Sequence, residues 1–384
     1  MTSAALRGER LTVLRDLEGL TQAALADLLE VSQSFLSQVE RGERPMPRDM
    51  ALAACHRYSL PEAFFEVVEG PAGTGEFTFR KKSSALVRDE RRIKALHLEG
   101  ARLFHAVSDA SGLAPVDLPD PDLFQRDPEV CANVLRERSG LGPNEPIINM
   151  TRFAERLGVG VILGLDAAGA AISDHTGISR PSRLNDRPLV AVVPQAPGAI
   201  QRISVGHELG HLIFDQDAGA TIRGTRSPEE ARAFRFAGAL LLPAGVVRSR
   251  ITESLTLHAY LRVKADYGIS VPAILRRARD LEVISAARYR SLSIQLASMG
   301  WRDQSREPVE VATERPILLR QAMAKVAGNQ GALFAARRWG LSPAAIQHWV
   351  GIPDDAPTVL ASVTPIRLAA AGRNRNHNNA DGRV

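Results

Sequence analysis

The stretch ISVGHELGHLIF, residues 203–214, places two histidines four positions apart, with a glutamate directly after the first. In an α-helix, residues four apart lie one turn apart on the same face, so His207 and His211 point the same way. Such a pair can reach one zinc ion at about 2.0–2.1 Å. Glu208 is rotated by roughly 100° around the helix, toward a water ligand rather than the metal. The stretch predicts either a zinc hydrolase centre with Glu208 as general base, or an apolar helix that happens to carry two imidazoles.

A tetrahedral zinc site needs a third protein ligand and an open fourth position for water. The segment SPEEARAFRFAGALLLP, residues 227–243, offers Glu230, which follows the helix-capping Ser227 by three positions. Ser-x-x-Glu is also the pattern of a capping box, in which the glutamate binds the helix end and no metal. The spacing leaves both roles open, and Asp215 and Asp217 are further candidates.

The segment TQAALADLLEVSQSFLSQVERG, residues 21–42, predicts two short helices joined by a tight turn, with Thr21 and Ser32 as N-caps. It resembles the XRE (lambda-repressor-like) helix-turn-helix family. The resemblance implies that the second helix enters the major groove of double-stranded DNA by its N-terminal end. The residues expected to read base edges are Gln33, Ser34, Ser37 and Gln38, and those expected near phosphates are Gln22 and Arg41.

One position departs from the XRE pattern, because Glu30 stands in the turn where the family usually has glycine. A left-handed backbone there costs glutamate roughly 1 kcal/mol, which a packed core can offset. Residues 1–70 also carry a net charge of −4, whereas the whole chain carries +5. A three-helix bundle that uses its polar face for protein contacts is therefore the alternative to DNA binding.

A strand, then HELGHLIF, a variable loop and EEARAFRFAGALLLP together resemble the ImmA/IrrE family of zincin-like metallopeptidases. The resemblance implies that Glu230 is the third zinc ligand beside His207 and His211. Two positions depart from the family pattern, because Phe234 stands where Asn or Asp is usual and Ala239 where Glu is common. A lost hydrogen bond to a metal ligand would weaken zinc affinity or catalysis. The resemblance continues over residues 260–302, which are similar to the helices after the peptidase core in regulators that fuse both modules.

The expected fold is multidomain and mainly α, with an α+β peptidase domain after the helix-turn-helix domain. A helix from residue 84 to 107, with a basic outer face, is expected to serve as a linker and a dimerising element. The expected ranges are a five-helix lambda-repressor-like domain at 1–70, a basic helical connector at 71–140, a zincin-like metallopeptidase domain at 141–250, a helical C-terminal domain at 251–370 and a disordered tail at 371–384.

The two resemblances together predict a DNA-binding transcription regulator, acting as a homodimer, whose zinc peptidase domain cleaves a partner repressor or the chain itself upon a stress signal. A substrate strand is expected to pair with RPLVAVVP, residues 187–194, at a sheet edge. The two cysteines and the lack of an apolar signal core or membrane span predict a cytoplasmic protein. The alternative is a regulator whose zincin-like domain senses a ligand or metal and cleaves nothing.

Overall fold

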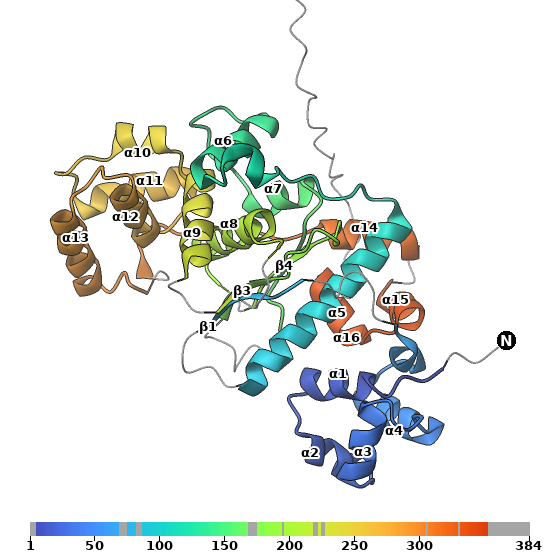
Figure 1. The fold of residues 1–384 in the computed structure, drawn as a ribbon. Helices are drawn as coiled ribbons and strands as arrows, with labels where there is room; N and C mark the ends of the chain where they lie inside the picture. Colours follow the sequence, from blue (N-terminus) through green and yellow to red (C-terminus); the bar gives the residue numbers. More distant parts are fainter. Residues whose placement is uncertain are drawn as a thin grey trace, which may run out of the picture.

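The computed structural model describes residues 5–68, 75–81, 87–167, 175–193, 196–217, 222–223, 227–303, 306–328 and 331–351. The tail expected at 371–384 lies outside these residues. The described chain is mainly helical, with one five-stranded sheet near its middle and the N-terminal helices at one side (Figure 1). Among the described helices, none combines the length and the apolar character that a membrane span requires.

The N-terminal domain is a compact group of helices that closes over its own apolar core. Its elements are α1 (Arg10–Leu17), α2 (Gln22–Leu28), α3 (Gln33–Glu40), α4 (Arg48–Tyr58) and the 3-10 helix η1 (Glu62–Glu66). Thr21 caps α2 by accepting from the Ala24 amide at 3.1 Å, and Ser32 caps α3 in the same way. Glu30 adopts φ of 55° in the turn between them, which confirms the left-handed residue expected there.

The sheet contains β1 (Thr78–Lys81), β2 (Gly160–Leu163), β3 (His175–Ser179), β4 (Leu189–Val192) and β5 (Ile222–Arg223). The strand order is β2-β4-β3-β1-β5. β4 pairs with β2 in parallel and with β3 in antiparallel orientation, so both of its edges are occupied. The expectation that residues 187–194 form an edge strand open to a substrate is therefore wrong.

Helices cover both faces of this sheet. Successive side chains of β4 point alternately to one face and the other, and each set is buried under helices. Val190 and Val192 join the core shared with α8, whereas Leu189 and Ala191 join the core shared with α5. The helices of this region are α5 (Val87–Ser111), η3 (Pro121–Phe124), α6 (Pro128–Arg138), α7 (Met150–Arg156), α8 (Gly198–Phe214) and α9 (Pro228–Leu241).

The C-terminal helices divide into two groups. The first group shares the core of α8 and α9 and consists of α10 (Ala244–Arg250), η4 (Leu257–Ala259), α11 (Tyr260–Tyr267), α12 (Val271–Asp280) and α13 (Ala286–Ser298). The second group packs around α5 and consists of α14 (Leu318–Ala327), α15 (Gly331–Trp339) and α16 (Pro343–Val350). α15 also contacts η1 of the N-terminal domain, so the end of the described chain lies beside its beginning (Figure 1).

Residues 71–140 are not the separate connector expected from the sequence. β1 is an inner strand of the sheet, between β3 and β5, and α5 packs its apolar stripe on β2, β4 and α14. The basic outer face of α5 is typical of a solvated linker. The opposite, apolar face packs on the sheet, so the helix forms one layer of the sheet domain. That same burial excludes the apolar stripe of α5 as a dimer surface, because Ile93, Leu103 and Phe104 are already covered within the chain.

A buried ion cluster joins the N-terminal domain to α5. The Arg10 guanidinium donates to both oxygens of Glu99 at 2.8 and 3.0 Å, and Arg102 pairs with the same carboxylate at 2.6 Å. Burial opposes the ionisation of Glu99, but the charges and hydrogen bonds of Arg102 and Arg10 lower its pKa to about 2. The N-terminal helices are thus fixed to the body of the molecule by a carboxylate that stays ionised.

We expect Glu99→Ala to lower the free energy of unfolding by about 3–5 kcal/mol, because it leaves the buried Arg10 guanidinium without its carboxylate partner. The free energy of unfolding is measured by denaturant titration, with circular dichroism as the signal. The control is Glu9→Ala, since Glu9 forms only an exposed ion pair with Arg7 and should change stability by less than about 1 kcal/mol. A lowered carboxyl pKa stabilises the fold above the unfolded value near 4.3, and this contribution disappears as the pH falls toward 2. Equal losses in both variants would contradict the role of Glu99.

Candidate functional site

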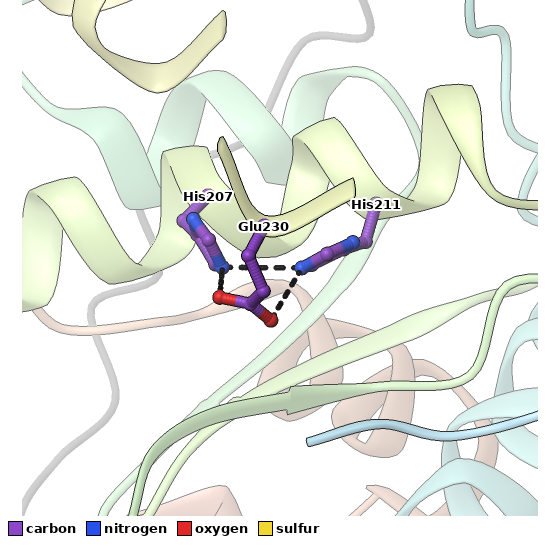
Figure 2. Close-up of side chains that lie close together, drawn as sticks. All are labelled: His207, His211 and Glu230. Carbon is purple, nitrogen blue, oxygen red and sulfur yellow. Dashed lines mark hydrogen bonds and ion pairs between the residues drawn. The ribbon is translucent and has the colours of Figure 1, made fainter. Parts of the chain in front are cut away.

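Three side chains from α8 and α9 converge in the interior of the molecule (Figure 2). The Nε2 atoms of His207 and His211 lie 3.1 Å apart. The two carboxylate oxygens of Glu230 lie 3.3 Å from His207 Nε2 and 3.4 Å from His211 Nε2. The exposed fractions of the three residues are only 4%, 0% and 1%. Their donor atoms all lie within 4.8 Å of one another, close enough to share one metal ion.

Small residues bring the two helices close enough for this arrangement. A Cβ atom added to Gly210 of α8 would lie 3.1 Å from the Cα of Ala233 in α9. A Cβ atom added to Gly206 would lie 3.3 Å from the Cβ of Ala237. Larger side chains at these positions would separate the helices and carry Glu230 away from the histidines.

The position of Glu230 distinguishes the two roles that the sequence left open. Ser227 does cap α9, since its hydroxyl accepts a hydrogen bond from the Glu230 amide at 3.2 Å. The Glu230 carboxylate, however, points to the histidines (Figure 2). A capping box needs that carboxylate at the amide of the N-cap residue. The geometry thus groups Glu230 with the two histidines, in a set of side chains that could hold one metal ion.

The buried triad also has the electrostatic character of a cation site. Burial opposes the ionisation of Glu230, but the neighbouring His207 and His211 lower its pKa to about 2. Burial opposes the protonation of His211, but its hydrogen bonds to Asp215 and Glu230 raise its pKa to about 10. Glu230 Oε2 has no hydrogen-bond partner among the described residues. Two imidazoles and one carboxylate are a known donor set for zinc, so these residues fit that ion.

Asp215 and Asp217, the other candidate ligands, lie outside the triad. Asp215 Oδ2 is 2.6 Å from Nδ1 of His211, and its other oxygen pairs with Arg232. A proton on Nδ1 leaves Nε2 free to bind a metal, so Asp215 would orient His211 for that role. Asp217 pairs with Arg183 at the exposed surface.

His207 lacks such an orienting partner. Its Nδ1 atom is buried and has no hydrogen-bond partner among the described residues. The ring of Phe234 packs against the imidazole instead, with the ring centroids 4.2 Å apart. Phe234 is one of the two positions that depart from the ImmA/IrrE pattern. The second, Ala239, is buried in the core beneath α9.

Glu208 is held by two hydroxyl groups that the sequence analysis did not identify. Ser179 Oγ lies 2.6 Å from Glu208 Oε2, and Thr78 Oγ1 lies 3.0 Å from the same oxygen. The two hydroxyls are 2.6 Å apart, and both residues are fully buried. Thr78 comes from β1 and Ser179 from β3, and these residues pair directly across the sheet. No local sequence pattern links positions 101 residues apart, so only the strand pairing identifies them.

A cavity of about 360 Å³ opens beside His207 and Glu208. Phe234 and the first residues of α8 form one apolar wall, and α12 forms the opposite wall. Arg235 and Arg276 also line it. The cavity places space for a substrate side chain next to the candidate general base.

The helix-turn-helix residues form a connected surface on α2 and α3. Gln33 Nε2 donates to Gln22 Oε1 at 3.3 Å, and Gln22 Nε2 donates to Glu40 Oε2 at 2.7 Å. Gln33 and Ser34 are exposed, whereas Gln22, Ser37 and Gln38 are half-buried. Arg41 is exposed and pairs with Glu43 at 2.9 Å. The chain of amides orients the N-terminal end of α3, where the sequence analysis expects contact with bases.

The comparisons with known proteins cover both regions. Residues 8–64 match the helix-turn-helix domain family, and residues 154–279 match the IrrE N-terminal-like domain family. The HTH-type transcriptional regulator PrpR of Mycobacterium tuberculosis is 38% identical over 63 residues, which are 16% of this chain and 13% of that protein. No solved structure matches the chain. The chain therefore joins a helix-turn-helix domain of the XRE type to a peptidase-like domain of the IrrE type.

Proposed function

We propose that this regulator binds operator DNA through α3 and hydrolyses a peptide bond at a zinc ion held by His207, His211 and Glu230. The observation that carries the proposal is the buried convergence of these three side chains, with Glu208 and a cavity directly beside them. A purely structural cluster would not place a base and an open cavity at the same point.

A bound zinc ion supplies a positive charge that polarises the scissile carbonyl and acidifies a water ligand. Glu208 takes a proton from the attacking water and passes it to the leaving amine nitrogen. Ser179 and Thr78 hold Oε2 of Glu208, so the carboxylate keeps one orientation while its proton moves. Asp215 fixes the tautomer of His211.

The substrate that we propose is a segment of a partner repressor or of the chain itself. Cleavage of a repressor would couple a stress signal to transcription, and two copies of the regulator would occupy two operator half-sites. The test is a comparison of cells with and without the regulator under DNA damage or metal stress. Mass spectrometry of protein N-termini should then detect a new terminus that depends on the regulator. Identical termini in both strains would leave no role for cleavage.

The second candidate function is metal or ligand sensing without hydrolysis. Phe234 supports it, because this residue packs on His207 and leaves Nδ1 of that ligand without a partner. A poorly oriented ligand binds zinc more weakly and exchanges it more readily.

The prediction that separates the two functions concerns Phe234. We expect Phe234→Asn to raise zinc affinity by about 10–100-fold, because an amide oxygen can accept the Nδ1 proton of His207. Competition with a fluorescent chelator measures the affinity. The control is Phe234→Leu, which removes the ring and adds no acceptor. If cleavage rises together with affinity, the peptidase function is favoured; higher affinity with no product in either protein favours the sensor.

The DNA-binding prediction concerns α3. We expect Gln33→Ala and Gln38→Ala each to weaken binding to the cognate operator by about 1–3 kcal/mol and to relax sequence preference. Arg41→Ala should weaken all DNA sequences more evenly, because a phosphate contact carries no base information. Fluorescence anisotropy on operator and scrambled duplexes provides both values. Unchanged operator affinity in the Gln33/Gln38 double variant would contradict the assignment of α3.

A further inference from the structure

A second cavity, of about 240 Å³, lies where the DNA-binding domain meets the rest of the chain. It shares no lining residue with the cavity beside the histidines. Its walls come from α1 and η1, from α5, from the segment after β2 and from α16. The apolar lining includes Leu14, Phe64, Leu96, Leu165, Leu341 and Trp349, all buried.

Arg92, Trp349 and His348 each donate to an acceptor near this cavity, whereas the Glu18 carboxylate has no such contact within the described part of the chain. Arg92 donates from Nε and Nη2 to Asp166, both at 3.0 Å, and Trp349 Nε1 donates to the Leu165 carbonyl at 2.9 Å. His348 Nε2 lies 2.5 Å from the Gly164 carbonyl, which makes this nitrogen the donor and Nδ1 an acceptor. The Glu18 carboxylate has no hydrogen bond or ion pair among the described residues.

Glu18 is the group that a ligand would neutralise. It follows the last residue of α1, lines the cavity and is exposed. Although Glu18 is exposed, the neighbouring elements remove part of the water around its carboxyl and raise its pKa. The nearby Arg92 lowers this pKa only in part, because Asp166 already pairs with that guanidinium. A cation placed at Glu18 would satisfy the charge without breaking an existing contact.

We propose that this cavity binds a small apolar amine, with its hydrocarbon body among the buried side chains and its ammonium group at Glu18. The volume sets the size of the ligand. A cavity of about 150 Å³ with a similar apolar lining holds benzene, so this one accommodates roughly nine or ten non-hydrogen atoms. Cavities of this kind occur preferentially between domains.

The position of the cavity connects the ligand to DNA binding. Glu99, which holds Arg10 of α1 and Arg102 of α5, lines the same cavity. A ligand that touches α1, α5 and α16 together stabilises the docked arrangement of the DNA-binding domain. Occupancy therefore alters how freely α3 can turn to face an operator, independently of the histidine site.

The test is calorimetric titration of the full chain with phenethylamine, 2-phenylethanol and phenylacetate. These probes share one body and differ in charge. We expect one phenethylamine per chain, with at least tenfold weaker binding of phenylacetate. Glu18→Gln should bring the amine to the affinity of the alcohol, and Ala345→Trp should remove binding by filling the cavity, since Ala345 lines it. The control, Glu137→Gln, alters an exposed carboxylate on α6 and should change nothing.

Three outcomes would overturn the proposal. They are the absence of phenethylamine binding at millimolar concentration, equal binding of the amine and the acid, and an unchanged preference in Glu18→Gln. Circular dichroism and thermal melting show whether Ala345→Trp is folded. If that variant does not fold, the exposed Glu18→Gln exchange still decides the result, because it leaves the apolar walls intact. A histidine-site variant, His211→Ala, should bind phenethylamine as the wild type does.

Discussion

A Glu208→Gln protein is expected to keep its fold, its zinc and its DNA affinity while its peptide cleavage falls by about 10²–10⁴-fold. The amide has the shape of the carboxylate and still receives the hydroxyl hydrogen bonds of Ser179 and Thr78. It cannot accept a proton, so only the activation of water is lost. The measurement is the initial rate of appearance of the new N-terminus, together with zinc content and operator binding of the same preparation.

The matched control for this exchange is Glu229→Gln. Glu229 is a half-buried carboxylate in the first turn of α9, next to Glu230, and does not line the cavity beside Glu208. Its loss should leave the cleavage rate within about twofold, as expected of a surface substitution away from the chemistry. Cleavage that persists unchanged in Glu208→Gln would assign the proton transfer to another group and would contradict the proposed mechanism.

The second large effect concerns the metal. The purified protein is expected to carry about one zinc ion per chain, and His207→Ala or His211→Ala should reduce this content to nearly none. Among the described residues, His207, His211 and Glu230 are the group of three that could hold an ion, so the loss of either imidazole leaves only two ligands. Inductively coupled plasma mass spectrometry of dialysed protein measures the content directly.

Glu230 and Ser227 provide an internal comparison for the same measurement. Glu230→Ala should lose zinc, because the carboxylate contacts both histidines. Ser227→Ala should keep zinc and lose only about 1 kcal/mol of stability, because its hydroxyl caps α9. Full zinc occupancy in Glu230→Ala would show that two histidines and water suffice, and the assignment of Glu230 as a ligand would be withdrawn.

The sequence predicted the parts of the site that depend on helical periodicity. The i, i+4 spacing of His207 and His211 and the one-face position of Glu230 follow from 3.6 residues per turn. The same logic predicted the helix-turn-helix, whose caps at Thr21 and Ser32 are now seen. These features are local, so a short window of sequence contains the information.

The parts that escaped prediction depend on contacts between distant segments. Thr78 and Ser179 meet at Glu208 only because β1 pairs with β3. The interior position of β4 follows from the order of the strands in the sheet, and the position of α5 follows from its packing on that sheet. The hydrophobic periodicity of a single segment does not encode either of them. The sequence offers Asp215 as a further candidate ligand, and only its contact with Nδ1 of His211 shows that it lies behind that imidazole.

The position of β1 in the sheet decides which deletions separate the helix-turn-helix domain from the peptidase-like domain. β1 begins at Thr78, ten positions after Val68, where the described part of the helix-turn-helix domain ends. A truncation that starts at residue 141 removes an inner strand, the α5 layer and a hydroxyl that holds Glu208. Its phenotype would combine the loss of operator binding with the loss of the peptidase-like domain. Deleting residues 5–68 alone leaves every described strand in place, although it removes Arg10, one of the two arginines that pair with Glu99. An allele with that boundary therefore separates the two halves more cleanly than the truncation does.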